Sequence, residues 1–524
     1  MNATNSTRPP TWAAAVAVAL AASLPLGYVL VRAAAAGSDT WSRLLDRRVP
    51  ELLINTLGLA AVVGAATLAI GGLLAYLVVR TDLPGRRLLA VLCALPLAVP
   101  PYVGAVTYAD VLGPRGGLAD LLGVGQLPSL FGFGGSALVL TLFTYPYVFL
   151  LTAAALRGVD PRLEEAARGL GRGPLAVLVG TTARLVMPAL LGGALLVALY
   201  VLSDFGTVSL LRFDTFTTVI YDELGGRFDP PAAAALSSVL VVLTVGLLLA
   251  GQGLRGRGRL EQAGGAPVAG PQQELGRWRW TALAGVLVLL ALALGLPLAR
   301  LLTWSFDVLP DQNAGEFAGW AFNSLLVSGL AAGVAVACAL PVALVLARRR
   351  AAGRVGLAVG SLAQAGYALP GVIVALALVA ISTRWFDAAY GTLGLLVAAF
   401  VIRFLPQAIQ SEEAGLQQIR DSLTEAARGL GATRAAAFRR VVLPLLRPSL
   451  AVSWAVVFLT AVKELPATLV LRPLGFDTLP VRIWTPARDG LYADAGPPAL
   501  LLVLLSLVPL YLLLARRRDV VPGI

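Results

Sequence analysis

The chain has 524 residues, of which 58% are hydrophobic and only 13% are charged, with 41 Lys and Arg against 29 Asp and Glu. Soluble domains carry about 25% charged residues, so this composition indicates a protein that crosses a membrane many times. The chain has no histidine and two cysteines, which excludes a Ser-His-Asp hydrolase, an imidazole-bound zinc ion and a disulfide scaffold. Its arginines are scattered between apolar segments, which is typical of loops beside membrane lipid and does not indicate a nucleic-acid partner.

Twelve apolar stretches are each long enough to cross a bilayer, which needs about 20 apolar residues per helix. The prolines between Pro96 and Pro101 predict that some of these spans are broken or bent, which is tolerated where neighbouring helices satisfy the backbone. The twelve stretches lie at 12–32, 52–79, 88–112, 135–156, 186–206, 232–251, 280–302, 321–347, 355–382, 391–410, 446–468 and 498–515.

The first stretch, 12–32, is followed by Ala34-Ala35-Ala36, which resembles the cleavage site of a signal peptide. The apolar core of a signal peptide usually has about 7–15 residues, and this stretch is longer. We therefore expect it to be retained as a membrane helix.

The loops between the stretches fall into two sets that differ in positive charge. The set that includes both termini carries 27 of the 41 Lys and Arg, and the other set carries 12. In the set with fewer Lys and Arg, the loop at 33–51 is an exception, because it carries three arginines. Because cytoplasmic loops are enriched in Lys and Arg, both termini are predicted to lie in the cytoplasm.

The sequence contains an internal duplication. Residues 163–171 and 423–431 are identical at eight of nine positions, and the same offset of 260 pairs Asp204 with Glu464. Further upstream, Asn55-Thr56-Leu57 resembles Asn323-Ser324-Leu325. Two six-helix series of the same topology form a parallel repeat, with halves at 1–252 and 279–524. Residues 253–278, rich in Gly, Gln and Arg, are predicted to be a flexible cytoplasmic linker.

The duplicated segment resembles the signature loop of the membrane subunits of ATP-binding-cassette (ABC) importers. That signature is Glu-Ala-Ala, three residues, Gly, nine residues and an aliphatic-x-Leu-Pro ending. The second copy fits throughout, whereas the first fits as far as Gly171 and has its nearest ending four residues late, at Leu185-Val186-Met187-Pro188. The resemblance implies a coupling helix that docks on an ATPase; a solvated loop copied with the rest is the alternative. The residues assigned to coupling are Glu165, Ala166, Ala167, Gly171, Glu425, Ala426, Ala427, Gly431, Leu443 and Pro444.

The chain lacks the features of an ATPase. A phosphate-binding P-loop needs Gly-Lys-Ser/Thr, and the single lysine, Lys463, is followed by Glu464. No nucleophile–base pair or metal-ligand set indicates a membrane enzyme either. We therefore expect no cofactor on this chain, with ATP and Mg²⁺ bound by a separate ABC ATPase subunit in two copies, one per loop.

Four further segments resemble the fused permeases of the ferric-iron uptake family: Ser203–Ser209, Thr215–Tyr221, Lys463–Thr468 and Leu471–Leu479. This resemblance implies an all-α polytopic protein of about twelve helices in two pseudo-symmetric halves, like a type I ABC importer permease in the cell inner membrane. It also implies Fe³⁺ delivered by an extracytoplasmic substrate-binding protein. Fused thiamine permeases share much of the pattern, so thiamine or another small solute stays open. An ion-coupled secondary transporter with parallel repeats is the alternative from another class.

Asp204 and Glu464 are the candidate residues of the translocation pathway, because they lie near the outer ends of equivalent spans. Carboxylates at membrane depth are costly and usually face a bundle interior or a wet cavity. Their hard oxygens suit a hard ion such as Fe³⁺. Alternatively, Glu464 pairs with Lys463, and Asp204 caps the chain where its helix ends.

Overall fold

The computed structural model describes residues 9–114, 116–227, 229–256, 273–308, 310, 313–347 and 349–516. In these residues the secondary structure is helical, apart from one isolated β-bridge between Thr81 and Gln273. The prediction of an all-α protein is confirmed. Most of the linker predicted at 253–278 lies outside the described residues, so its predicted flexibility stays a prediction.

Within the described parts of the chain, ten helical segments are long and apolar enough to cross a membrane. Two bent helix pairs bring the number to twelve if each pair forms one span. The bent pairs are Arg86–Ala98 with Pro101–Ala119, at 90°, and Gly353–Tyr367 with Gly371–Trp385, at 103°. They correspond to the third and ninth predicted stretches, so the predicted number of twelve is reached when each pair is counted as one broken span.

The break in the third span lies at its prolines, as predicted. The backbone leaves the helical conformation at Val99, and the next helix begins at Pro101. Proline locks φ, lacks an N–H group and disfavours a helical residue before it, so it is accommodated at the first turn of a new helix. In the ninth span Pro370 has the same role, and the next helix begins at Gly371.

The chain forms two compact units whose composition differs from that of the sequence halves. Unit 1 consists of Met1–Gly37, Phe228–Ser238 and Asn313–Val481, and unit 2 of Ser38–Arg227, Val239–Gln312 and Arg482–Ile524. The first span of the first half, Thr11–Ala34, thus belongs to unit 1 together with the central spans of the second half. The first span of the second half, Trp278–Val308, belongs to unit 2 together with the central spans of the first half. The repeat boundaries at 1–252 and 279–524 stay a prediction.

Unit 2 has a core of three spans, α3, α7 and α10, that pack against one another, while α5 packs on α7, α11 and α15. Gly71 of α3 and Gly193 of α10 allow a close approach to α7, because a Cβ at either position would lie 2.8 Å from Val148. The elements of this unit are α2 (Ser38–Arg43), η1 (Leu44–Arg48), α3 (Val49–Arg80), α4 (Arg86–Leu92), η2 (Leu95–Ala98), α5 (Pro101–Leu112), α6 (Gly117–Leu122), α7 (Phe133–Arg157), α8 (Pro161–Gly169), α9 (Pro174–Val177), η3 (Leu178–Thr182), α10 (Ala183–Ser203), α11 (Gly206–Leu210), α12 (Phe216–Gly225), α14 (Trp278–Leu290), η4 (Ala291–Gly295), α15 (Leu296–Val308), η9 (Ala493–Ala495) and α25 (Gly496–Arg516).

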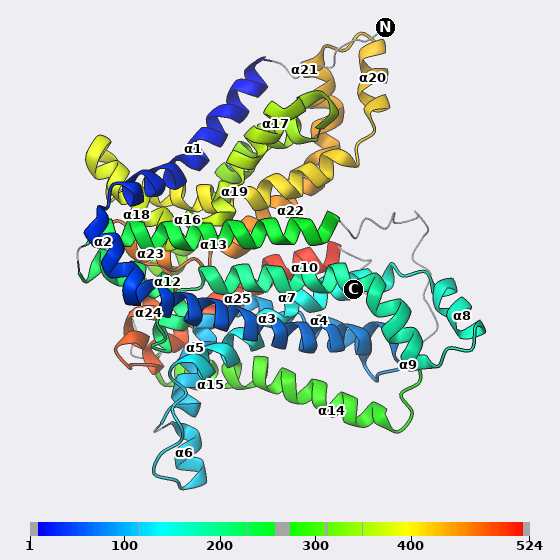
Figure 1. Cartoon of the computed structure of the whole chain (residues 1–524), viewed down its shortest axis with the longest axis vertical. Coiled ribbons are helices and arrows are strands. Elements are labelled where there is room, and N and C mark those ends of the chain that lie inside the picture. The colour runs from blue at the N-terminus through cyan, green and yellow to red at the C-terminus, as the bar shows by residue number, and fades with distance from the viewer. Residues whose placement is uncertain are drawn as a thin grey trace. The chain divides into compact units, whose positions relative to one another are not determined.

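Unit 1 repeats this core with α16, α19 and α22, while α18 packs on α23 and α1 packs on α16, α17 and α18 (Figure 1). Its elements are α1 (Pro9–Ala34), α16 (Ala314–Leu346), α17 (Arg349–Ala363), η6 (Ala365–Ala368), α18 (Gly371–Trp385), η7 (Asp387–Ala389), α19 (Leu393–Gln417), α20 (Asp421–Gly429), α21 (Arg434–Ala437), η8 (Phe438–Val442), α22 (Leu443–Ala461) and α23 (Pro466–Leu471). Two helices, α13 (Pro230–Gly256) and α24 (Leu479–Arg488), have residues assigned to both units. Each unit therefore contains an equivalent core of three spans. One Glu-Ala-Ala loop connects two spans of each core, α7 with α10 and α19 with α22.

Candidate coupling site

The two Glu-Ala-Ala loops have the same backbone. Each loop begins with a nine-residue helix, α8 or α20. A turn, a four-residue helix (α9 or α21) and a five-residue π-helical turn (η3 or η8) follow before the next span begins. Every element of the second copy starts 260 residues after its counterpart in the first copy. The duplication thus extends through the whole loop, beyond the nine residues that the sequences share.

The glycine that follows Glu-Ala-Ala at the same distance in both loops has a conformational role. Gly171 and Gly431 have left-handed backbones, with φ of +80° and +85°. The N–H of the residue after each glycine turns back to the helix and donates to the carbonyl of Ala167 in the first copy (3.2 Å) and Ala427 in the second (3.0 Å). This closes the helix and satisfies a carbonyl that would otherwise lack a partner. A side chain at either glycine would strain the turn that ends each loop helix.

A leucine in the turn projects from each loop into solvent. Leu170 is 82% exposed and Leu430 is 90% exposed. The same large apolar side chain is thus exposed at the equivalent position of both loops. Of the residues assigned to coupling, the structure places Glu165, Ala166, Gly171, Glu425, Ala426, Gly431 and Pro444 as exposed, Ala427 and Leu443 as half-buried, and Ala167 as buried.

The second part of the signature is present in one copy only, yet both copies fold alike there. Leu443 and Pro444 begin α22, where proline is favoured because the first turn of a helix needs no N–H partner. At the same backbone positions the first copy has Ala183 and Arg184, which begin α10. The sequence difference therefore leaves the course of the loop unchanged.

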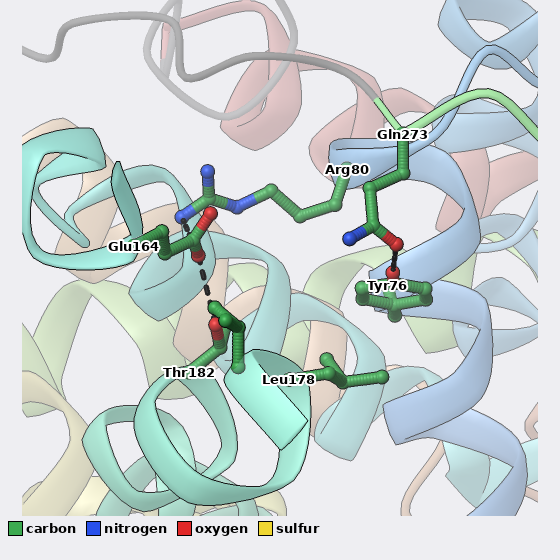
Figure 2. Close-up of a pocket in the computed structure, with 7 residues that line it drawn as sticks. Tyr76, Arg80, Glu164, Leu178, Thr182 and Gln273 are labelled. Atoms are coloured by element: carbon green, nitrogen blue, oxygen red, sulfur yellow. Dashed lines mark hydrogen bonds and ion pairs between the residues drawn. The ribbon is translucent and has the colours of Figure 1, made fainter. Parts of the chain in front are cut away.

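Glu164 is the position at which the two nine-residue copies differ, and sequence reasoning gave it no role. Its carboxylate lies 3.2 Å from the guanidinium of Arg80, at the end of α3, and accepts a hydrogen bond of 2.8 Å from the Thr182 hydroxyl (Figure 2). Both charged side chains are 7% exposed. In the second copy this position is Thr424, whose hydroxyl donates to the carbonyl of Asp421 in its own helix. The single mismatch in the repeat was the signal in the sequence that this loop has an extra contact.

Asp204 lies where α10 ends and caps the helix that follows. One carboxylate oxygen accepts the backbone N–H groups of Thr207 (3.1 Å) and Val208 (3.3 Å), and the other accepts the Thr207 hydroxyl (3.1 Å). A carboxylate at this place satisfies the free N–H groups at the start of α11. Asp204 is 8% exposed, so these bonds compensate for removing the charge from water.

Glu464 lies at the equivalent break between α22 and α23. Its carboxylate forms an ion pair with Arg403 of α19 and accepts the backbone N–H of Ala467 at 3.3 Å. Gly371, at the start of α18, makes room for this pair, because a Cβ there would overlap both charged groups. Both candidate carboxylates thus have partners within their own units, and their role in the translocation pathway stays a prediction. Among the described residues no cluster of three Asp, Glu or Cys could hold a metal ion.

Residues 67–253 and 339–520 match the family described as the binding-protein-dependent transport system inner membrane component. The chain belongs to this family. Each matched segment contains one Glu-Ala-Ala loop, which agrees with an internally duplicated type I permease. The permease is therefore a multi-pass membrane component of an ABC importer.

Relatives of the permease include one that matches over nearly the full length of both chains. It is 32% identical over 515 residues to the Fe(3+)-transport system permease protein FbpB 2 of Haemophilus influenzae, covering 97% of this chain and 98% of the relative. It is 24% identical over 488 residues to the ferric transport system permease protein FbpB of Actinobacillus pleuropneumoniae, covering 88% and 70%. A "probable molybdenum ABC transporter permease protein" of Haloferax volcanii is 29% identical over 248 residues, covering 46% of this chain and 90% of the relative.

Proposed function

We propose that this permease carries ferric iron across the membrane in an importer driven by ATP. The observation that supports the substrate is the similarity over 97% of the chain to a relative named as an Fe(3+)-transport permease. The two equivalent loops, each with an exposed leucine and an exposed glutamate, support a separate motor with two docking sites.

The proposed partners follow from this arrangement. Two copies of an ABC ATPase bind the Glu-Ala-Ala loops on the cytoplasmic side, and ATP and Mg²⁺ bind to that ATPase. An extracytoplasmic binding protein delivers the substrate on the opposite side. Most Lys and Arg lie on the side of the membrane that holds both termini and both coupling loops. Because cytoplasmic loops are enriched in these residues, both termini are in the cytoplasm.

The route by which the motor moves the permease is the continuous backbone from loop to span. α10 follows directly from η3, has 21 residues, and ends at the cap formed by Asp204. At 1.5 Å per residue it is about 30 Å long, enough to cross the apolar part of a bilayer. In the other unit, α22 connects the second loop to the break at Glu464 in the same way. A displacement of either coupling helix therefore reaches the opposite end of the span that follows it.

The experiment that tests this proposal is transport by the complete complex in proteoliposomes. The permease, its ATPase and its binding protein are reconstituted, and uptake of radioactive iron is followed with ATP, with no nucleotide and with a non-hydrolysable analogue. We expect iron uptake with ATP alone. Equal uptake without the ATPase would instead favour an ion-coupled transporter.

The substrate is tested separately through the binding protein. Purified binding protein is analysed for bound iron, thiamine and molybdate, and each solute is added in excess to the iron uptake assay. We expect ferric iron in the purified protein and no competition from thiamine or molybdate. Retention of another solute would reject iron and leave the ATP-driven mechanism in place.

A further inference from the structure

A polar cluster packs against the first coupling helix, with three of its side chains buried and two half-buried. It consists of Tyr76, Arg80, Glu164, Thr182 and Gln273, which we name the anchor cluster (Figure 2). Glu164 belongs to α8, Arg80 and Tyr76 to the end of α3, and Thr182 to the π-helical turn η3. Gln273 comes from the end of the segment that joins the two sequence halves. The cluster therefore brings together the coupling loop, a central span and the connection to the second half.

The connecting segment is bonded to the end of α3 by its backbone. The N–H of Gln273 donates to the carbonyl of Arg80 (2.8 Å), and the N–H of Asp82 donates to the carbonyl of Gln273 (3.2 Å). The N–H of Leu275 donates to the carboxylate of Asp82 at 2.8 Å. The hydroxyl of Tyr76 donates to the side-chain oxygen of Gln273. Residues 273–275 are thus fastened to the same helix end that carries Arg80.

The charged pair completes the connection to the coupling helix. The Arg80 and Glu164 side chains are each 7% exposed, so removing either charge would leave the other buried without a compensating partner. The Thr182 hydroxyl also holds the carboxylate of Glu164 in place, because it donates to the same oxygen that lies beside Arg80. Glu164 cannot move away from α3 without leaving Arg80 buried and uncompensated.

The second half has different side chains at the equivalent positions. At the repeat offset of 260 residues, Thr424 corresponds to Glu164 and Val442 corresponds to Thr182. Neither threonine nor valine can form an ion pair, and valine has no hydroxyl. The carboxylate and the hydroxyl of the anchor cluster are therefore present in one copy of the duplicated loop.

We infer that the anchor cluster positions the first coupling helix: it fixes α8 to α3 and to the segment entering the second half, and the cluster stays closed while the motor moves the loop. The two coupling helices consequently transmit movement unequally, because the first moves α3 and the connecting segment together with α10. This inference rests on the proposed function. Arg80, Glu164, Thr182 and Gln273 are positioning residues, since they act through α8.

The test measures how much iron is transported per ATP hydrolysed by the complete complex in proteoliposomes. Thr182→Val reproduces the residue of the second copy and should lower this ratio about threefold, whereas Glu164→Gln should lower it about tenfold. Gln273→Ala should lower it about twofold, since one side-chain bond is lost and the backbone bonds remain. Thr303→Val, which removes an exposed hydroxyl bonded within its own helix, and Glu274→Ala, an exposed neighbour of Gln273, should leave the ratio unchanged.

Co-purification of the ATPase and the rate of ATP hydrolysis separate positioning from a purely structural role. Positioning predicts that Thr182→Val retains the ATPase and its hydrolysis rate while uptake falls. The charge exchange Arg80→Glu with Glu164→Arg should recover part of the ratio lost in Glu164→Gln. An unchanged ratio in Thr182→Val, or equal losses of hydrolysis and uptake in it, would overturn the inference. Absence of ATP-driven iron uptake in the unmodified complex would reject the proposed function instead.

Discussion

The ion pair between Arg403 and Glu464 provides a test of how the second unit is stabilised. Their side chains are 16% and 5% exposed. In Arg403→Met the carboxylate keeps only the N–H of Ala467 and remains in an apolar bundle. Removing one partner of a buried pair costs about 3–5 kcal/mol. The folded population should therefore fall by a factor of about 100 or more relative to the unfolded one.

The assay is thermal unfolding of the purified permease in detergent. Arg403→Met should lower the midpoint by on the order of 5 °C. Arg403→Met combined with Glu464→Gln should recover most of this loss, because a neutral pair of similar volume removes the uncompensated charge while the glutamine oxygen can still accept the N–H of Ala467. Arg384→Met, an exposed arginine of α18, is the control and should change the midpoint little. A stable Arg403→Met variant would refute the reasoning.

Variants with neutral side chains at Asp204 and Glu464 test whether these two carboxylates belong to the translocation pathway. If they do, Asp204→Asn with Glu464→Gln lowers iron uptake while the complex still assembles. Uptake by the stable Arg403→Met, Glu464→Gln variant should then also remain low. Normal uptake by both variants would show that Asp204 and Glu464 serve only the local structure in which they are bonded.

Two further predictions concern the repeated backbone features. Gly431→Val should weaken ATPase co-purification, because a left-handed backbone costs a β-branched residue about 1–2 kcal/mol, whereas Gly333→Val, at a helical glycine of α16 with open space around it, should retain the ATPase. Equal loss in both variants would contradict the role of the turn. Asn323→Ala should remove the bond of 2.9 Å to the carbonyl of Asp477, and Asn55→Ala the equivalent bond of 3.0 Å to Asp214. Each should raise hydrogen exchange in the loop that follows Asp204 or Glu464, and protection equal to that of the unmodified chain would contradict the prediction.

The sequence predicted the features that depend on periodicity and local chemistry. Lipid imposes apolar stretches of a fixed length, so twelve spans could be counted, and prolines without N–H groups identified the break near Val99. The duplication could be found because Glu165 and Glu425 lie in nearly identical segments. The left-handed turn at each loop glycine was not predicted, because glycine permits positive φ without requiring it, and Gly169 and Gly429 of the same segments are helical.

The contacts between distant segments could not be predicted in this way. Arg80 and Glu164 are 84 positions apart, and Arg403 and Glu464 are 61 apart, so no helical period relates them. The pairing of Glu464 with Arg403 depends on how α19 packs against the break after α22. The composition of the two units was likewise not predicted, because hydropathy identifies a span and does not identify the helices that it packs against.

The most direct test of the central claim is whether the two loops hold the motor. Glu165→Arg with Glu425→Arg should abolish co-purification of the ATPase and ATP-driven iron uptake, because both exposed glutamates lie on the proposed docking surface. Glu316→Arg, an exposed glutamate in the first turn of α16, should retain both properties. ATPase binding and uptake at the unmodified level in the double variant would contradict the account.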